Sequence, residues 1–208
     1  DFGVVKKVLR NWLDDQLDHR LLVPTKSERL SYKIENDRIS LNWNFGNDNT
    51  LTMEAPLEAV ALIDADEIND QTASIWSIRQ LSSHFPDNLE HIQLSFEAEE
   101  INAAYYHYSH GLKKHDGNCQ RIAHGHRSRI QIWSDGARDR DLENNWADRW
   151  SDIYIGSEED LVSISSGDKP IMHFAYDAPQ GHFQLTLPKQ VCYLMPTDTT
   201  VECIAAHI

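Results

Sequence analysis

The stretch Ser31-Tyr-Lys-Ile-Glu-Asn-Asp-Arg-Ile-Ser-Leu-Asn-Trp43 decides how the chain is expected to fold. Apolar and polar residues alternate on both sides of Asn36-Asp37, and alternation is typical of strands, in which successive side chains point to opposite faces. A turn signal between two such runs indicates a β-hairpin. The centre of this stretch therefore predicts antiparallel β-structure.

Helices are expected on both sides of this hairpin. Residues 3 to 17 place apolar side chains at intervals of three and four, as an amphipathic helix does, and residues 66 to 82 carry a second stripe of this kind. Residues 196 to 200 have the composition of a helix start, with Glu202 in the first turn.

Strands are expected in much of the remaining chain. Residues 91 to 97 alternate as a strand, residues 99 to 102 form a turn, and residues 103 to 109 form the returning strand. Further strands are predicted at 126 to 133, 171 to 176 and 182 to 187. The polar segment from 134 to 152 has no clean periodicity, and we interpret it as a solvated insertion loop rather than a functional lid.

This order of elements predicts an α+β protein. Strands and helices do not alternate one by one, so we expect an antiparallel sheet with the helices on one face. Two similar halves are expected, the first over residues 1–102 and the second over residues 103–208. The sequence begins without Met and stops within an apolar-periodic segment, so we expect a fragment with elements missing at both ends.

The charge and the cysteines limit the classes of function. The formal net charge of −14 disfavours nucleic acid and anionic membrane surfaces as partners. No run of about eighteen apolar residues and no charged-then-apolar leader is present, which argues against a spanning helix and secretion. Three cysteines without regular spacing do not form a disulfide framework, so a reducing, cytoplasmic location is expected.

His124-Gly-His126 is the strongest local signal for chemistry. Residues i and i+2 of a strand share a face, so both imidazoles can reach one metal ion. A catalytic zinc needs three protein ligands and an open position, and a third histidine lies upstream among His107, His110 and His115. An isolated pair of this kind is usually incidental, but the additional histidines and the nearby Cys119 favour a zinc site.

Cys119 and the pair Asp18-His19 are candidates for acid–base chemistry. Polar neighbours surround Cys119, and a thiol beside a dication and an arginine should have a lowered pKa, which makes it a base or nucleophile. It could instead be a fourth ligand of a structural zinc. Asp18-His19 follows the first predicted helix, where it is either a cap with a surface imidazole or an acid–base pair.

Together these stretches resemble the 6-pyruvoyltetrahydropterin synthase / 6-carboxytetrahydropterin synthase family. The segments that carry the resemblance are short: Asp1 to Lys6, Leu17 to Leu22, Ser109 to Leu112, Cys119 to His126 and Pro196 to Glu202. In a single-module member the zinc histidines precede the Asp-His motif, whereas here Asp18-His19 lies far upstream. The resemblance therefore implies two tandem ββααββ modules of the tunnelling fold (T-fold), with complementary halves of one site.

The resemblance also implies an activity and roles for single residues. A lyase would convert 7,8-dihydroneopterin triphosphate to a 6-carboxy- or 6-pyruvoyltetrahydropterin, and the short spacing from Cys119 to His124 favours the carboxy-forming branch. His110, His124 and His126 would bind Zn²⁺, Cys119 would remove a proton, and Asp18-His19 would shuttle one. Glu97 or Glu202 would bind the pterin ring, and the protein is expected to form a homo-oligomer. A non-catalytic zinc-containing pterin-binding protein and a structural zinc module remain as alternatives.

Overall fold

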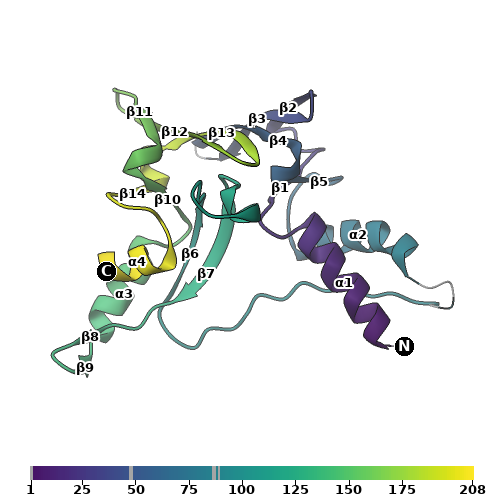
Figure 1. Cartoon of the computed structure of the whole chain (residues 1–208), viewed down its shortest axis with the longest axis horizontal. Helices are drawn as coiled ribbons and strands as arrows, with labels where there is room; N and C mark the ends of the chain where they lie inside the picture. Colours follow the sequence, from purple (N-terminus) through teal and green to yellow (C-terminus); the bar gives the residue numbers. More distant parts are fainter. Residues whose placement is uncertain (1, 47–48, 86–87, 89) are drawn as a thin grey trace.

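A computed structural model describes residues 2–46, 49–85, 88 and 90–208. It shows an α+β protein with four α-helices and several sheets, as the sequence predicts (Figure 1). Within these residues, no helix is long and apolar enough to cross a membrane. Asp1, the first residue of the segment Asp1 to Lys6 that carries part of the family resemblance, lies outside the described residues.

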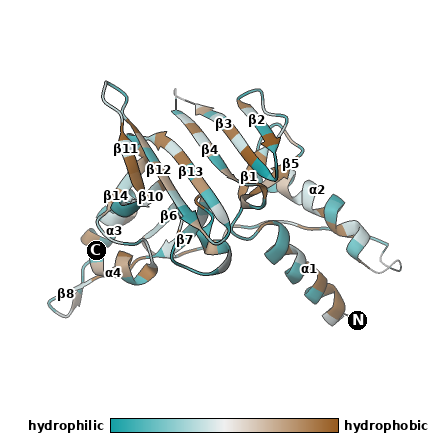
Figure 2. Ribbon diagram, turned by 45° about the horizontal axis from the view of Figure 1, so that its top comes forward, coloured by the Kyte–Doolittle hydropathy of each residue, from teal (hydrophilic) through white to brown (hydrophobic). Residues whose placement is uncertain are grey.

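The largest sheet has six antiparallel strands in the order β11-β12-β13-β4-β3-β2. These strands span Leu161–Ile164, Ile171–Ala178, Gly181–Pro188, Asn49–Pro56, Arg38–Gly46 and Leu30–Glu35. The predicted hairpin forms β2 and β3, and its turn residues Asn36 and Asp37 adopt φ of 50° and 58°. β12 and β13 confirm the strand pair predicted around residues 179 to 181. Figure 2 shows apolar and polar residues interspersed along these strands.

Two of the three other sheets of the described residues contain parallel pairs, so the prediction of one antiparallel sheet is wrong. β1 (Leu21–Pro24) is parallel to β5 (Val60–Ile63), and β10 (Ile153–Ser157) is parallel to both β14 (Cys192–Met195) and β6 (Tyr105–His110). β7 (His124–Arg129) pairs antiparallel with β6. The parallel pairs arise because the chain makes long excursions, either three antiparallel strands or a helix, before it returns beside its starting strand.

The segment from 134 to 152 is not a loop, which corrects a second expectation. It contains a short hairpin of β8 (Trp133–Ser134) and β9 (Ala137–Arg138), followed by helix α3 (Arg140–Arg149). Asp139 caps this helix by accepting a hydrogen bond from the backbone N–H of Leu142 (2.9 Å). The helix packs on β6 and buries Trp150, which immediately follows it. Many charged residues conceal its narrow apolar stripe in the sequence.

Three predicted helices form, and one predicted strand does not. α1 (Phe2–Gln16), α2 (Asp70–Leu81) and α4 (Val201–His207) lie where helices are predicted. Residues 90 to 104 have no regular secondary structure, so the strand predicted at 91 to 97 is wrong. This segment runs in an extended path from the end near α2 towards β6 (Figure 1).

The elements form an internal repeat, of which the sequence predicts only that two similar halves exist. α1-β1-β2-β3-β4-β5-α2 is followed later by α3-β10-β11-β12-β13-β14-α4, in the same order and with the same pairings. β4 and β13 each end in a proline that precedes a three-residue 3₁₀ turn, and these two strands pair with each other. We call these units the first and second repeats. The β6–β7 hairpin lies between them in the chain and in space (Figure 1).

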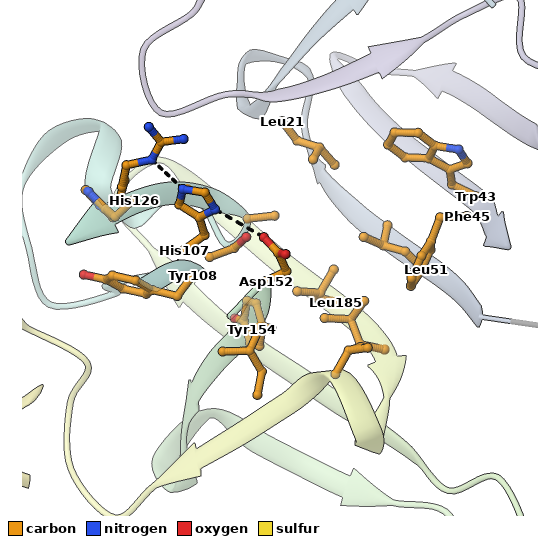
Figure 3. Close-up of a pocket in the computed structure, with 17 residues that line it drawn as sticks. Leu21, Trp43, Phe45, Leu51, His107, Tyr108, His126, Asp152, Tyr154 and Leu185 are labelled. Atoms are coloured by element: carbon orange, nitrogen blue, oxygen red, sulfur yellow. Dashed lines mark hydrogen bonds and ion pairs between the residues drawn. The ribbon is translucent and has the colours of Figure 1, made fainter. Parts of the chain in front are cut away.

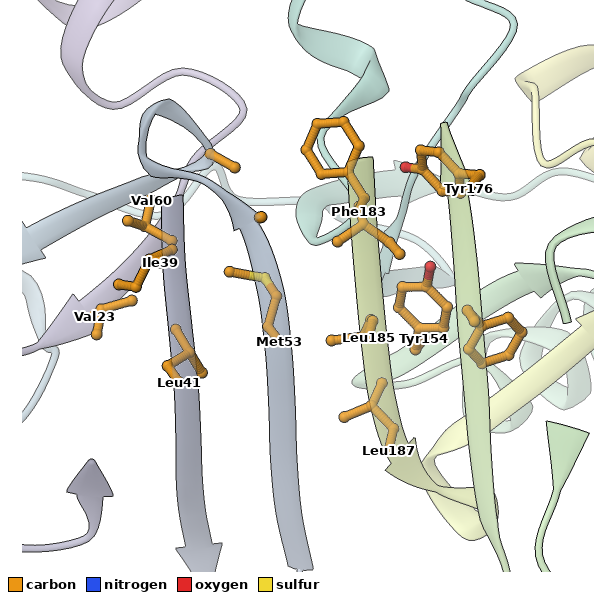
Figure 4. Packing of buried hydrophobic residues seen from close by; sticks show 14 of the residues in the cluster. Val23, Ile39, Leu41, Met53, Val60, Tyr154, Tyr176, Phe183, Leu185 and Leu187 are labelled. Atoms are coloured by element: carbon orange, nitrogen blue, oxygen red, sulfur yellow. The ribbon is translucent and has the colours of Figure 1, made fainter. Parts of the chain in front are cut away.

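Two apolar clusters hold these layers together. The larger one buries the inner face of the six-stranded sheet against β1, β5 and β10, with Ile39, Met53, Phe174 and Phe183 almost fully buried (Figure 4). The smaller one packs β6, β10 and β14 on α3 and α4 around Trp150. Burial of each large apolar side chain stabilises the fold by about 1.5–3 kcal/mol. The β6–β7 hairpin is therefore held between two packed bodies.

Candidate metal centre

A cluster of four histidines lies where the β6–β7 hairpin meets the turn after α1. His110 is the last residue of β6, and His124 and His126 come from β7, in which His124 pairs with His110 and His126 with Tyr108. The three side chains share a face of the hairpin because they lie at alternate positions and opposite one another. His19 approaches from the first repeat, with its ring centroid 4.8 Å from that of His124.

The rings are close enough to surround a single ion. The ring centroid of His110 lies 4.6 Å from that of His124 and 5.0 Å from that of His126. The ligand atoms of His19, His124 and His126 all lie within 4.8 Å of one another, so these three residues could hold a metal ion. The zinc–nitrogen bond is about 2.0–2.1 Å long, so donors around one ion are expected within a few ångströms of each other.

Hydrogen bonds to the protein fix the tautomers of two buried histidines. Nδ1 of His124 donates to the backbone carbonyl of Arg121 (2.7 Å). Nδ1 of His110 lies 2.9 Å from Thr199 Oγ1 and 3.0 Å from the Thr199 carbonyl oxygen. Nε2 of both rings is buried and has no hydrogen-bond partner among the described residues. Outer hydrogen bonds of this kind orient histidine ligands in metal sites, and a metal ion would satisfy the two orphaned nitrogens.

Burial also keeps these imidazoles in the form that binds metals. Loss of hydration, together with the neighbouring imidazoles, lowers the pKa of His110 to about 2, and loss of hydration lowers the pKa of His124 to about 3. Burial lowers the pKa of His126 as well. All three rings are therefore neutral at neutral pH, and a neutral imidazole is the metal-binding form.

Asp18, His19 and Cys119 form a chain of polar contacts beside the histidine cluster. Nδ1 of His19 donates to Asp18 Oδ2 (2.6 Å), and Nε2 of His19 lies 3.4 Å from Sγ of Cys119. His19 adopts a φ of 55°, an unusual backbone angle for a residue other than glycine, which turns its side chain towards the hairpin. The carboxylate fixes the orientation and tautomer of His19, and the second nitrogen can exchange a proton with the thiol.

No protein-family model matches the chain, and comparisons with curated proteins and with solved structures find no match either. The assignment of chemistry to this site therefore depends on its own geometry.

The geometry distinguishes two possible sets of ligands. His19 satisfies the distance criterion with His124 and His126, but both of its nitrogens already have partners in Asp18 and Cys119. His110 lies outside that trio, yet its free Nε2 is buried and faces the same cluster. The orphaned nitrogen favours His110 as a ligand, because leaving it without a partner costs free energy that a bound ion would restore.

Two expected substrate ligands, Glu97 and Glu202, lie outside the hydrogen-bond network described for the histidine cluster. Glu97 lies in the irregular segment before β6, and Glu202 lies in the first turn of α4, both with exposed side chains. Over the described residues, no hydrogen bond or ion pair connects either carboxylate with Cys119 or the histidines. Their roles stay predictions that depend on the resemblance alone.

Two residues that support the site were not predicted from the sequence in these roles. Arg121 is buried, its guanidinium donates to the Asp18 carbonyl (3.1 Å), and its own carbonyl accepts from His124. Thr199 is buried behind His110. Arg121 thereby connects the two halves of the site through its side chain and its backbone. The contacts of Arg121 with Asp18 and of Thr199 with His110 have no sequence signal, since both join distant parts of the chain.

Proposed function

We propose that the protein is a zinc-dependent lyase whose site is built from the first repeat and the β6–β7 hairpin. The observation that carries this proposal is the pair of orphaned Nε2 atoms of His110 and His124 next to the Asp18–His19–Cys119 chain. His110, His124 and His126 would hold the zinc ion, because histidine ligands with an open fourth position are typical of catalytic zinc sites. When bound, the ion would act as a Lewis acid on oxygen atoms of the substrate.

Cys119 and His19 would transfer the protons. Cys119 as thiolate would remove a proton from a carbon of the substrate side chain, and the nearby His19 would accept or return a proton at a hydroxyl group. Asp18 would hold the His19 ring in position. The hydrogen bond between Cys119 and His19 supports the base role of the thiol over the role of a fourth ligand.

For the substrate we propose 7,8-dihydroneopterin triphosphate, from the resemblance of these motifs to the 6-pyruvoyl- and 6-carboxytetrahydropterin synthases. The product would be 6-carboxy-5,6,7,8-tetrahydropterin in the branch that the spacing from Cys119 to His124 favours. Glu97 or Glu202 would bind the pterin ring in this proposal. Two tandem T-fold modules would explain the repeat, the sparse cysteines fit a cytoplasmic location, and the resemblance implies a homo-oligomer.

The decisive experiment combines metal analysis with identification of the product. Purified full chain should contain about one zinc ion per chain, and incubation with 7,8-dihydroneopterin triphosphate should give a tetrahydropterin whose mass distinguishes the carboxy from the pyruvoyl product. Chelator-treated protein serves as the control and should be inactive until zinc is restored. Undamaged protein without zinc would refute the proposal. Zinc-loaded protein that binds the pterin without turnover would favour the non-catalytic alternative.

A further inference from the structure

A pocket of about 550 Å³ lies between the six-stranded sheet and the β6–β7 hairpin (Figure 3). Its hairpin side includes His107, Ser109, Gly125 and Arg127, which alternate along the strands with the clustered histidines. Alternate residues of a strand point to opposite faces. These four residues therefore face away from the histidine cluster, although His126 of that cluster also lines the pocket.

The walls of the pocket are apolar and come from both repeats. Trp43 and Leu51 belong to the first repeat, and Leu185 and Leu187 belong to the second. Phe45 stands at the rim with 42% of its surface exposed. Small-molecule sites are commonly concave, largely apolar and about 300–1,000 Å³ in volume, and they form preferentially where two units meet. The body of a ligand here would be apolar, and the aromatic side chains favour a flat ring.

Three polar side chains converge at the hairpin end of the pocket. Nε of Arg127 donates to Nε2 of His107, so Nε2 acts as the acceptor. Nδ1 of His107 therefore donates to Asp152 Oδ1 (3.3 Å). Figure 3 shows both interactions as dashed lines. A positive and a negative group thus flank the imidazole, and their charges oppose each other.

This arrangement selects the charge of a ligand. Asp152 would repel a carboxylate, and Arg127 would repel an ammonium group. Arg127 also donates from Nη1 to the Glu99 carbonyl (2.6 Å), which leaves part of its guanidinium available, and the Asp152 side chain is 80% exposed. A group that can both accept and donate hydrogen bonds without a net charge complements such a pair.

We propose that this pocket binds a neutral small molecule with a flat, apolar body and an amide-like polar end. The ring lies against Trp43 and Phe45, and the amide group meets Arg127 and Asp152. The pocket borders the candidate metal centre at His126, but the proposal does not require the lyase activity, because ligand binding is measured directly.

The test compares ligands that share one body and differ in charge. Calorimetric titration of the full chain with 2-naphthamide, 2-naphthoate and 2-naphthylmethylammonium should show the amide binding at least about tenfold more tightly than either ion. Acetamide, which lacks the ring, should bind more weakly than 2-naphthamide by a similar factor. Equal affinities for the three naphthyl compounds, or binding of none of them, would overturn the proposal.

Two variants make the test specific to this pocket. Asp152→Asn removes the negative charge, so 2-naphthoate should gain about tenfold in affinity while 2-naphthamide changes little. Asp152 is exposed and has a φ of 54°, a conformation that Asn tolerates. Phe45→Ala should weaken the binding of 2-naphthamide. Ile34→Ala should not, because Ile34 is equally exposed at 42% but lies outside the pocket. Equal effects of Phe45→Ala and Ile34→Ala, or no gain for 2-naphthoate, would contradict the assignment.

Discussion

Sγ of Cys119 lies 3.4 Å from Nε2 of His19, although one hundred residues separate them in the chain. Cys119 belongs to the loop of the β6–β7 hairpin, and His19 ends the turn between α1 and β1. Arg121 holds these two segments together by donating a hydrogen bond to the Asp18 carbonyl. The candidate site thus forms within a single chain, where the first repeat meets the hairpin that precedes the second.

Replacement of Cys119 tests whether this thiol is a base or a ligand. Cys119→Ala should abolish lyase turnover while the zinc content stays near that of the parent protein, because Cys119 contacts His19 rather than completing the metal set. Turnover and zinc content can be measured on the same samples. Cys192→Ala is the matched control, since burial raises the pKa of the Cys192 thiol to about 12 and keeps it protonated. Loss of zinc from Cys119→Ala would favour the ligand role.

The two possible ligand sets predict opposite results for His110 and His19. His110→Ala should weaken zinc binding by more than about 100-fold, because even an outer hydrogen-bond partner of a ligand is commonly worth 10–100-fold. His19→Ala should keep most of the zinc affinity, since both His19 nitrogens have other partners. Competition with a chromophoric chelator measures both affinities. The reverse order would establish His19, His124 and His126 as the ligands.

Thr199 should act on the metal through His110. Thr199→Val leaves Nδ1 of His110 with only the backbone carbonyl as partner, and zinc affinity should fall roughly 10–100-fold. Thr199→Ser keeps the hydroxyl group and should restore the affinity. Thr200→Ala is a local control, because Thr200 caps α4 and its loss should cost about 1 kcal/mol of stability without a comparable change in zinc affinity. Equal zinc affinities in Thr199→Val and Thr199→Ser would refute this role.

Local patterns predicted those elements whose signals lie within one segment. The alternation around Asn36-Asp37 gave β2 and β3, and the three- and four-residue spacing gave α1 and α2. α3 was missed because its buried side chains are few among many charges, and without it the parallel pairing of β6 with β10 could not be foreseen. The alternation at residues 91 to 97 predicted a strand that does not form, because a strand also needs a neighbouring strand to pair with.

The same reasoning explains what could be predicted of the candidate site. His124 and His126 share a strand face, so their proximity follows from spacing alone. The pairing of His110 with His124 depends on the register of the hairpin, which the sequence does not specify. The contacts of Arg121 with Asp18 and of Thr199 with His110 join segments that meet only after the repeats have packed. Such contacts have no local signal.

Glu143 should make the stability of the second repeat depend on pH. Its carboxylate accepts two hydrogen bonds from Arg138 (2.6 and 2.8 Å) and one from the backbone N–H of Ile132 (3.0 Å). The hydrogen bonds from Arg138 lower the pKa of Glu143 from 4.5 to about 2. Because the folded-state pKa is depressed, this stabilisation is present above about pH 4.5 and is lost as the pH falls towards about 2.

Glu143→Gln should remove that dependence. Urea midpoints measured across this pH range should fall more steeply for the parent protein than for Glu143→Gln, and the variant should be less stable at neutral pH. Asp141→Asn, in the same helix turn, controls for the loss of a negative charge near the helix N-terminus. Parallel pH profiles for the parent and Glu143→Gln would contradict the prediction.

Gly156 allows β10 to approach the six-stranded sheet. A Cβ atom at this position would lie 2.3 Å from Cε1 of Phe174, and the Phe174 ring is fully buried and cannot move aside without disturbing the larger core. Gly156→Ala should therefore destabilise the fold by about 1–3 kcal/mol, as overpacking commonly does. Gly125→Ala, in β7, meets nothing closer than 3.8 Å and should cost much less. Chemical denaturation of both variants measures the loss in free energy of unfolding. Equal losses for Gly156→Ala and Gly125→Ala would show that the packing of Phe174 against Gly156 does not limit the distance between β10 and the sheet.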